Sequence, residues 1–205
     1  MPICDRDIPG TINLATQLHR QIQEAIEDVE SKFEPKLSST LASIEKAMEN
    51  MEESTCLADL DFANVQCQMN IKEAENMVDE MAALVSHIDP GSYSRFAAIA
   101  MHNDPEQDRA RLMTVQQLRN HFEVKVARLE YKLAIRKSTI LCHRNKAAVQ
   151  LLLFRGRLEG AFGPGEAPDD HEERVARIEE EDVYTQAGAY EVLLRVGARL
   201  GIPIV

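Results

Sequence analysis

Histidine and cysteine are the residue types in this chain that could hold a metal ion or act as a nucleophile, and their spacing suits neither role. The six histidines include no pair at the i, i+4 spacing that places two ligands on one helix face. The four cysteines form no CxxC pair and have no zinc-like spacing to a histidine pair. Cys142 and His143 are adjacent in sequence, so they point to different sides of a helix. We therefore expect reduced thiols, no metal site and no cofactor.

Carboxylates are abundant but poorly placed for catalysis. General acid–base catalysis needs two carboxylates whose environments drive their pKa values apart. The paired acids, such as Glu52-Glu53 and those at 179–182, lie in highly charged helical segments that we expect to face water. The sequence also contains no GxxxxGK[ST] phosphate loop and no GxSxG nucleophile elbow. We expect no catalytic residues and predict that the chain is not an enzyme.

A basic block at residues 125–157 is the strongest concentration of one charge. It holds 9 Lys/Arg and one acid, Glu130, whereas residues 1–90 hold 18 Asp/Glu and 6 Lys/Arg. Ion pairing between this basic block and the acids of residues 1–90, within one chain or between subunits, would use both sets of charges. Binding of the basic block to nucleic acid or to an anionic membrane is the alternative. The block has two aromatic residues, Tyr131 and Phe154, so base stacking is poorly provided for. The candidates for charge pairing or anion binding are Arg128, Lys132, Arg136, Lys137, Arg144 and Lys146.

Composition points to an elongated helical protein. Of 205 residues, 28% are charged, 5% are aromatic and none is tryptophan. The net charge of −11 argues against the whole chain binding phosphate-rich surfaces. Residues 1–10 lack the features of a secretory signal, and no apolar run approaches the ~20 residues that span a bilayer. We expect a cytoplasmic protein, with the nucleus as the alternative.

Apolar periodicity predicts an all-α fold: an elongated antiparallel coiled-coil hairpin with a kinked N-terminal helix and a short C-terminal helical element. A tail at 1–10 precedes a helical hairpin at 11–159, with helices at about 11–34, 36–88 and 105–159. Pro35 should kink or break the chain, and Asp89-Pro90-Gly91 should form the turn. A linker at 160–168 then leads to a C-terminal helical segment at 169–205.

The helix expected at 36–88 changes register partway along. Its first apolar row has a seven-residue period and ends at Ala58, and a second row with the same period begins at Leu60. We interpret this shift as a local change in supercoil. The first row is Leu37, Ile44, Met51 and Ala58, and the second is Leu60, Cys67, Ala74, Met81 and Ile88.

The end of the helix expected at 105–159 is apolar on more than one side. Leu151, Leu152, Leu153 and Phe154 cannot all face one neighbouring helix. Either the C-terminal segment folds back over them or another chain packs there. These four residues are the candidate partner-binding site.

The region of the expected hairpin bend resembles a known family. The segment Leu84–Pro90 (LVSHIDP), followed by Arg95–Ala97 (RFA), is similar to the bend of the small coiled-coil subunit of dynactin. The tryptophan-bearing motif expected near that family's N-terminus is missing. The resemblance implies a class of protein, coiled-coil subunits associated with the cytoskeleton or with motors.

These observations favour a non-catalytic coiled-coil scaffold or adaptor subunit of a larger intracellular multiprotein assembly. Its partners would be proteins bound through helix packing, in a hetero-oligomeric complex or a homodimer. The alternative is a nucleic-acid or anionic-membrane binding module that uses the basic block at 125–157.

Overall fold

A computed structural model describes residues 20–21, 23–86, 105–163 and 165–204, and for residues 105–119 and 121 it describes the backbone alone. Within these ranges the chain is all-helical and contains no strand, as predicted. The expected N-terminal tail at 1–10 and the turn at 89–91 lie outside the described residues. The elements are η1 (Val29–Phe33), α2 (Glu34–Glu52), α3 (Leu57–Ser86), α5 (Pro105–Leu158) and α6 (His171–Leu200).

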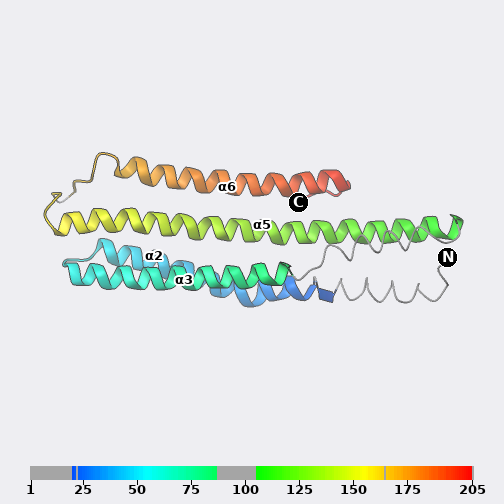
Figure 1. Cartoon of the computed structure of the whole chain (residues 1–205), viewed down its shortest axis with the longest axis horizontal. Helices are drawn as coiled ribbons and strands as arrows, with labels where there is room; N and C mark the ends of the chain where they lie inside the picture. Colours follow the sequence, from blue (N-terminus) through cyan, green and yellow to red (C-terminus); the bar gives the residue numbers. More distant parts are fainter. Residues whose placement is uncertain (1–19, 22, 87–104, 164, 205) are drawn as a thin grey trace.

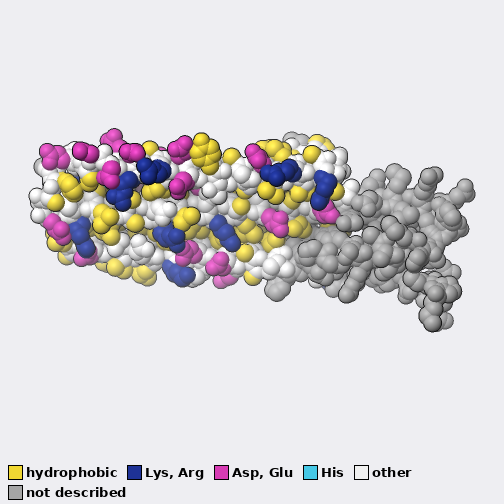
Figure 2. Space-filling model, turned by 45° about the horizontal axis from the view of Figure 1, so that its top comes forward, with side chains coloured by type: hydrophobic (Ala, Val, Ile, Leu, Met, Phe, Trp, Pro, Cys, Tyr) yellow, Lys and Arg dark blue, Asp and Glu magenta, His cyan; other side chains and the backbone are white. Residues whose placement is uncertain are grey.

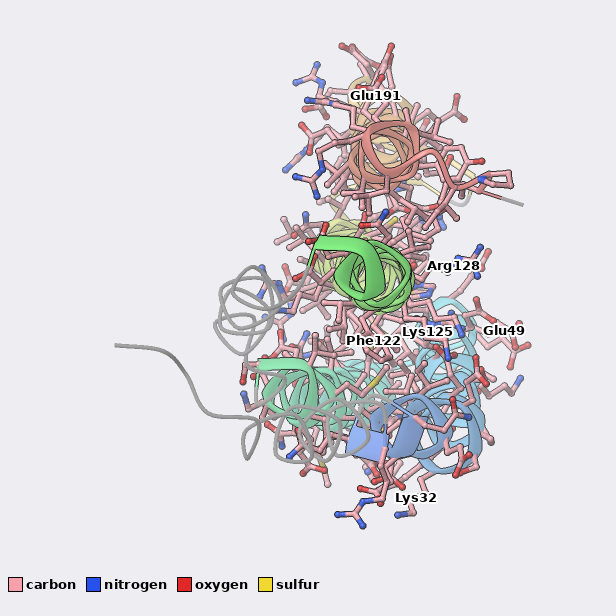
Figure 3. All side chains as sticks on the ribbon, turned by 90° about the vertical axis from the view of Figure 1, so that its right-hand side faces the viewer. Lys32, Glu49, Phe122, Lys125, Arg128 and Glu191 are labelled. Atoms are coloured by element: carbon pink, nitrogen blue, oxygen red, sulfur yellow. The ribbon has the colours of Figure 1, made fainter. Side chains whose placement is uncertain are left out.

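Helix α5 is the long central element, and the other helices pack on two of its faces (Figure 1). Helices α2 and α3 lie side by side against one face, and α6 runs along the opposite face (Figure 3). The helices therefore form three layers, with α5 in the middle.

Ion pairs between the layers fix the direction of each helix relative to α5. From the pair Lys132–Glu30 to the pair Arg136–Glu34 the residue numbers rise on both helices, so η1 and α2 run parallel to α5. Along α3 and α6 the partner numbers fall as those of α5 rise, so these helices are antiparallel to it. The pairs that show this are Arg144–Glu75 and Arg155–Asp61 for α3, and Arg199–Glu123 and Lys146–Glu179 for α6.

The expectation of one uninterrupted helix over 36–88 is wrong, because the chain reverses direction at residues 53–56. Helix α2 ends at Glu52, and the Ser54 hydroxyl donates a hydrogen bond back to the Asn50 carbonyl, 2.8 Å away. Helix α3 then returns along α2, and Lys36 pairs with Glu73 at 3.1 Å. The register shift predicted as a change in supercoil is therefore the site of a helical hairpin, and Ala58 is exposed after the turn.

The reversal allows the two seven-residue rows to bury each other. Burial of a large apolar side chain contributes roughly 1.5–3 kcal/mol, so the two rows together outweigh the cost of ordering a short turn. A third row, on α5, completes this core. The fully or nearly fully buried members are Leu37, Ile44 and Met51 of α2, Leu60, Cys67, Ala74 and Met81 of α3, and Phe122, Leu129, Leu133, Ile140 and Ala147 of α5.

Pro35 does not break or end the helix, so of the two predicted outcomes, a kink or a break, the break is wrong. The π-helical turn η1 directly precedes it, and the Glu34 N–H donates to the Val29 carbonyl five residues back. Proline in a regular α-helix clashes with the carbonyl four residues earlier. The wider π turn relieves this crowding, and Pro35 lies in the first turn of α2, where a missing N–H costs little.

The segment between α5 and α6 packs back onto the end of α5. The Phe162 ring lies against Gly156, where an added Cβ would be 2.4 Å from a ring carbon. The Arg157 side chain donates to the Glu166 carbonyl at 3.1 Å. Helix α6 ends at Leu200, because Gly201 takes a left-handed conformation and the Ile202 N–H donates a hydrogen bond to the Gly197 carbonyl.

Candidate partner-binding surfaces

Four of the six basic candidates form ion pairs within the chain, and their partners lie on four different elements. Lys132 contacts Glu30 of η1 at 2.6 Å, and Arg136 forms a two-pronged contact with Glu34 of α2. The other two pairs are Arg144 with Glu75 of α3 at 3.3 Å and Lys146 with Glu179 of α6. Most of these side chains are partly exposed, so each ion pair contributes at most ~1 kcal/mol to the free energy of unfolding. The pairs affect the alignment of the packed helices more than their stability.

A hairpin folded about residues 96–97 was expected to set the basic block beside the acids between residues 45 and 61, but the block pairs mainly with other acids. Of the acids between residues 45 and 61, Asp61 pairs with Arg155 at 2.6 Å, and Glu45 lies 3.9 Å from His143. The two remaining candidates, Arg128 and Lys137, are exposed (Figure 3 labels Arg128 on the flank of α5). Basic side chains are interspersed with acidic ones on the face that Figure 2 shows, rather than gathered into one basic patch.

The four apolar candidates near the end of α5 differ in how far they are buried. Leu153 and Phe154 are buried in the core, and Leu151 is partly buried against it. Leu152 is 62% exposed. Phe162 and Ala167, which follow α5, also pack against this core. Leu152 is therefore the one candidate of the four that another chain could reach without a rearrangement.

Helix α3 carries a second apolar row, on the side opposite its buried row. Phe62 is 68% exposed, Val65 is 52% exposed and Met69 is 61% exposed. With Ala58 they are spaced four, three and four residues apart, so they lie on one helix face. We call these four residues the α3 outer row. Sequence reasoning missed it, although the signal was present: Phe62, Val65 and Met69 are large apolar residues at helical spacing that belong to neither predicted row.

Helix α6 also exposes large apolar residues. Val183, Tyr190 and Leu194 lie along one flank, and the Tyr190 ring packs at 5.5 Å from that of Tyr131 on α5. The side of α6 that faces α5 includes the buried Leu193 and Gly197. The exposed residues of α6 are thus partly engaged with α5 through Tyr190, whereas the α3 outer row faces away from α5.

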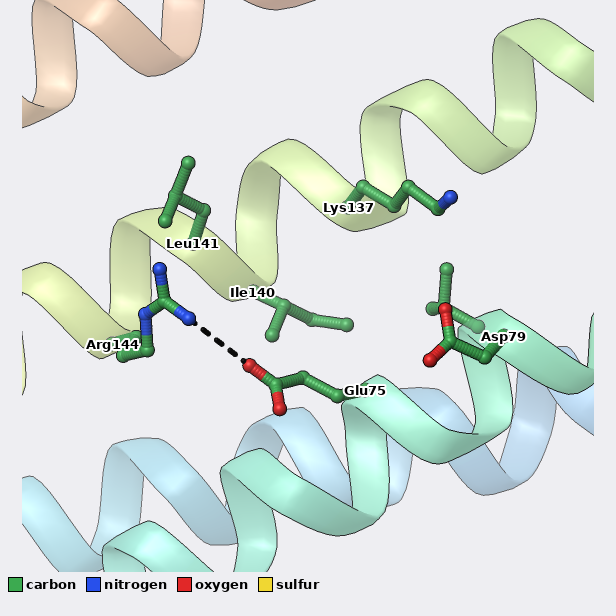
Figure 4. Close-up of a pocket in the computed structure, with 7 residues that line it drawn as sticks. Glu75, Asp79, Lys137, Ile140, Leu141 and Arg144 are labelled. Carbon is green, nitrogen blue, oxygen red and sulfur yellow. Dashed lines mark hydrogen bonds and ion pairs between the residues drawn. The ribbon is translucent and has the colours of Figure 1, made fainter. Parts of the chain in front are cut away.

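A pocket of about 290 Å³ opens between α3 and α5 (Figure 4). Its floor includes Ile140, and the Arg144–Glu75 ion pair crosses it. Lys137 and Asp79 lie at its other end (Figure 4). Two basic and two acidic side chains balance each other, so the pocket has no net charge with which to select an anion or a cation.

Cys142 and His143, in the C-terminal half of α5, face different helices. Burial, with nearby Asp182, raises the pKa of the Cys142 thiol, which disfavours the nucleophilic thiolate. Burial lowers the pKa of His143, whose Nε2 lies 3.9 Å from Glu45 of α2 and whose Nδ1 is buried without a hydrogen-bond partner. The two side chains therefore do not form the thiol–imidazole pair that activates a cysteine.

Across the described ranges, no cluster of three or more His, Cys, Asp or Glu side chains could hold a metal ion. None of the helices in the part of the chain that the structure describes has both the length and the apolar character needed to cross a bilayer. Comparison with protein-family models, curated proteins and solved structures finds no match for the chain.

Proposed function

We propose that the chain is a non-catalytic helical scaffold or adaptor subunit of a larger cytoplasmic protein assembly. The α3 outer row carries this proposal. Large apolar side chains that are more than half exposed, at heptad spacing and on a helix already packed on its other side, are typical of a surface that binds a further helix. Association with the cytoskeleton or with a motor is part of the proposal and rests on the resemblance at residues 84–97.

The charges support a protein partner over a nucleic acid or an anionic membrane. Most of the basic block is engaged with acids of the same chain, so phosphate binding would have to break these pairs. The exposed surface that remains is rich in acids, and a chain of net charge −11 repels phosphate-rich surfaces at long range.

Isolation of the full chain from its native cells tests the proposal. We expect the 23.1 kDa chain to be recovered in a larger complex with protein partners at fixed stoichiometry, and cross-links from Lys72 of α3 to reach those partners. Recovery of the chain alone would contradict the scaffold function. So would recovery in a complex that nuclease or detergent disperses.

A further inference from the structure

In the described part of the chain, helix α6 packs on the other helices through its interface with α5, whereas α2, α3 and α5 pack on one another (Figure 3). Helices α3 and α6 each have 30 residues, yet nine residues of α3 are buried and only two of α6, Leu193 and Gly197. Among the described residues, none in the core shared by α2, α3 and α5 belongs to α6. Separation of α6 from α5 would therefore leave that core packed.

Ion pairs hold both ends of α6 on α5. Lys146 of α5 contacts Glu179 of α6 at 2.5 Å, and Arg199 of α6 contacts Glu123 of α5 at 2.8 Å. In each pair one side chain is more than half exposed, Glu179 at 56% and Arg199 at 66%. Ion pairs that water reaches are weak and are screened by salt. The attachment of α6 should therefore weaken as the salt concentration rises.

We propose that α6 is a salt-sensitive cover that detaches from α5 as a unit while α2, α3 and α5 stay packed. Elements with few buried apolar contacts open at a lower free energy than the whole molecule. The hinge would lie between Ala167, which packs against the core of the other helices, and His171, where α6 begins. This inference goes beyond the proposed function and does not depend on it.

Detachment would uncover a second face of α5. The buried Ser138 hydroxyl donates a hydrogen bond to the Asp182 carboxylate of α6, which places Ser138 on the face that α6 covers. Ala127 and Val124 precede Ser138 by about three and about four helical turns, so they share this face. Both are buried but lie outside the core shared by α2, α3 and α5. Helix α6 therefore controls access to an α5 face on which another helix could pack.

Three cysteines of the native chain report on different parts of the molecule. Burial, with Asp182 and Glu179 of α6, raises the pKa of the Cys142 thiol on α5. Cys67 is fully buried in the core, and Cys56 is exposed between α2 and α3. Detachment of α6 would remove the two acids and part of the burial, so the Cys142 thiol would become more reactive.

Alkylation of the full chain with iodoacetamide, followed at each cysteine by peptide mass spectrometry, tests the inference. We expect Cys142 to react more slowly than Cys56 and faster than Cys67. Raising the salt concentration from ~20 mM to ~500 mM should increase the Cys142 rate relative to the Cys56 rate at least about threefold, because both ion pairs of α6 with α5 are screened. Cys67 should stay unreactive, since the core remains packed.

Two substitutions at the end of α6 separate detachment from a general charge effect. Arg199→Glu places like charges across the interface, opposite Glu123, whereas Arg195→Glu, the matched control, breaks a pair within α6, with Glu191 at 3.4 Å. We expect Arg199→Glu to raise the Cys142 rate at least about threefold and Arg195→Glu to leave it unchanged. Glu123 and Cys142 are about 28 Å apart along α5, so this effect would report release of the whole helix. Circular dichroism establishes that both variants keep their helices.

Several results would overturn the inference. Equal rates at Cys142 and Cys67 would show that α6 leaves α5 only when the core unfolds. A Cys142 rate that neither salt nor Arg199→Glu changes would show that the ion pairs do not hold α6. Hydrogen exchange should release the α6 amides together and before those of α3, and release of the α6 ends alone would show fraying instead. None of these measurements involves a partner, so failure here would leave the scaffold function standing.

Discussion

Substituting alanine for either of two glycines in α6 should change the free energy of unfolding in opposite directions. Gly188 lies in the middle of the helix with nothing within 4 Å of the position that a Cβ would take. Gly197 is buried, and its added Cβ would lie 2.4 Å from the Ile204 side chain and 2.9 Å from the Ile202 carbonyl oxygen. Gly188→Ala should therefore stabilise the chain, and Gly197→Ala should destabilise it.

The magnitudes follow from helix propensity and from overpacking. Alanine in place of glycine in a helix interior gains about 0.5–1 kcal/mol, and Gly188→Ala should realise this gain. Gly197→Ala gains the same amount but must displace the chain end, since the Ile202 contact is with backbone and cannot be relieved by a rotamer change. Overpacking of this kind costs about 1–3 kcal/mol, so we expect a net loss of about 1 kcal/mol.

Urea denaturation followed by circular dichroism measures both free energies of unfolding. Ile204→Ala combined with Gly197→Ala should recover part of the loss, because the shortest contact is with the Ile204 side chain. Equal stabilisation by Gly188→Ala and Gly197→Ala would refute the packing of the C-terminal residues against α6.

Three further predictions concern the core, the charges and the buried histidine. Ile44→Ala should cost about 2–5 kcal/mol in denaturation because Ile44 is fully buried, whereas Val65→Ala on the outer face should change the free energy of unfolding by at most about 0.5 kcal/mol. Arg136→Glu should lower the melting temperature more at low salt, and adding Glu34→Arg should restore it; no restoration would contradict this pairing. Because burial lowers the pKa of His143 in the folded chain, stability is fully present above the ordinary histidine pKa of 6.5 and is lost as pH falls below it, and His143→Gln should flatten this part of the pH profile.

The sequence patterns predicted the helices better than their arrangement. Heptad rows identify the buried residues of α2, α3 and α5 because burial on one helix face imposes that period. The reversal at residues 53–56 was not predicted, since it contains neither proline nor glycine. The sequence carries two signals of it: the polar Thr55 stands seven residues after Met48 in the row of Leu41 and Met48, and the apolar rows change register at Leu60. Both signals fit a turn as well as a change in supercoil.

The candidate surfaces were harder to predict, because exposure depends on which helices meet. The sequence marks Leu151–Phe154 as apolar on more than one side, but only the packing around the end of α5 decides that Leu153 is buried and Leu152 is not. The same holds for α6, where Leu193 faces α5 and Leu194 does not. Two adjacent leucines are the same residue type, so only the helices packed around them determine which one is buried.

The chain reversal at residues 53–56 matters most, because it places the α3 outer row on the outside of the molecule. Spin labels introduced as non-native amino acids at Ser43 and Gln66 measure it directly. The Lys36–Glu73 ion pair sets these two positions opposite each other, and packed helices are 8–10 Å apart, so we expect about 20 Å or less between the labels. A distance of about 35 Å, the length of 23 residues in one straight helix, would contradict the reversal and with it the α3 docking surface.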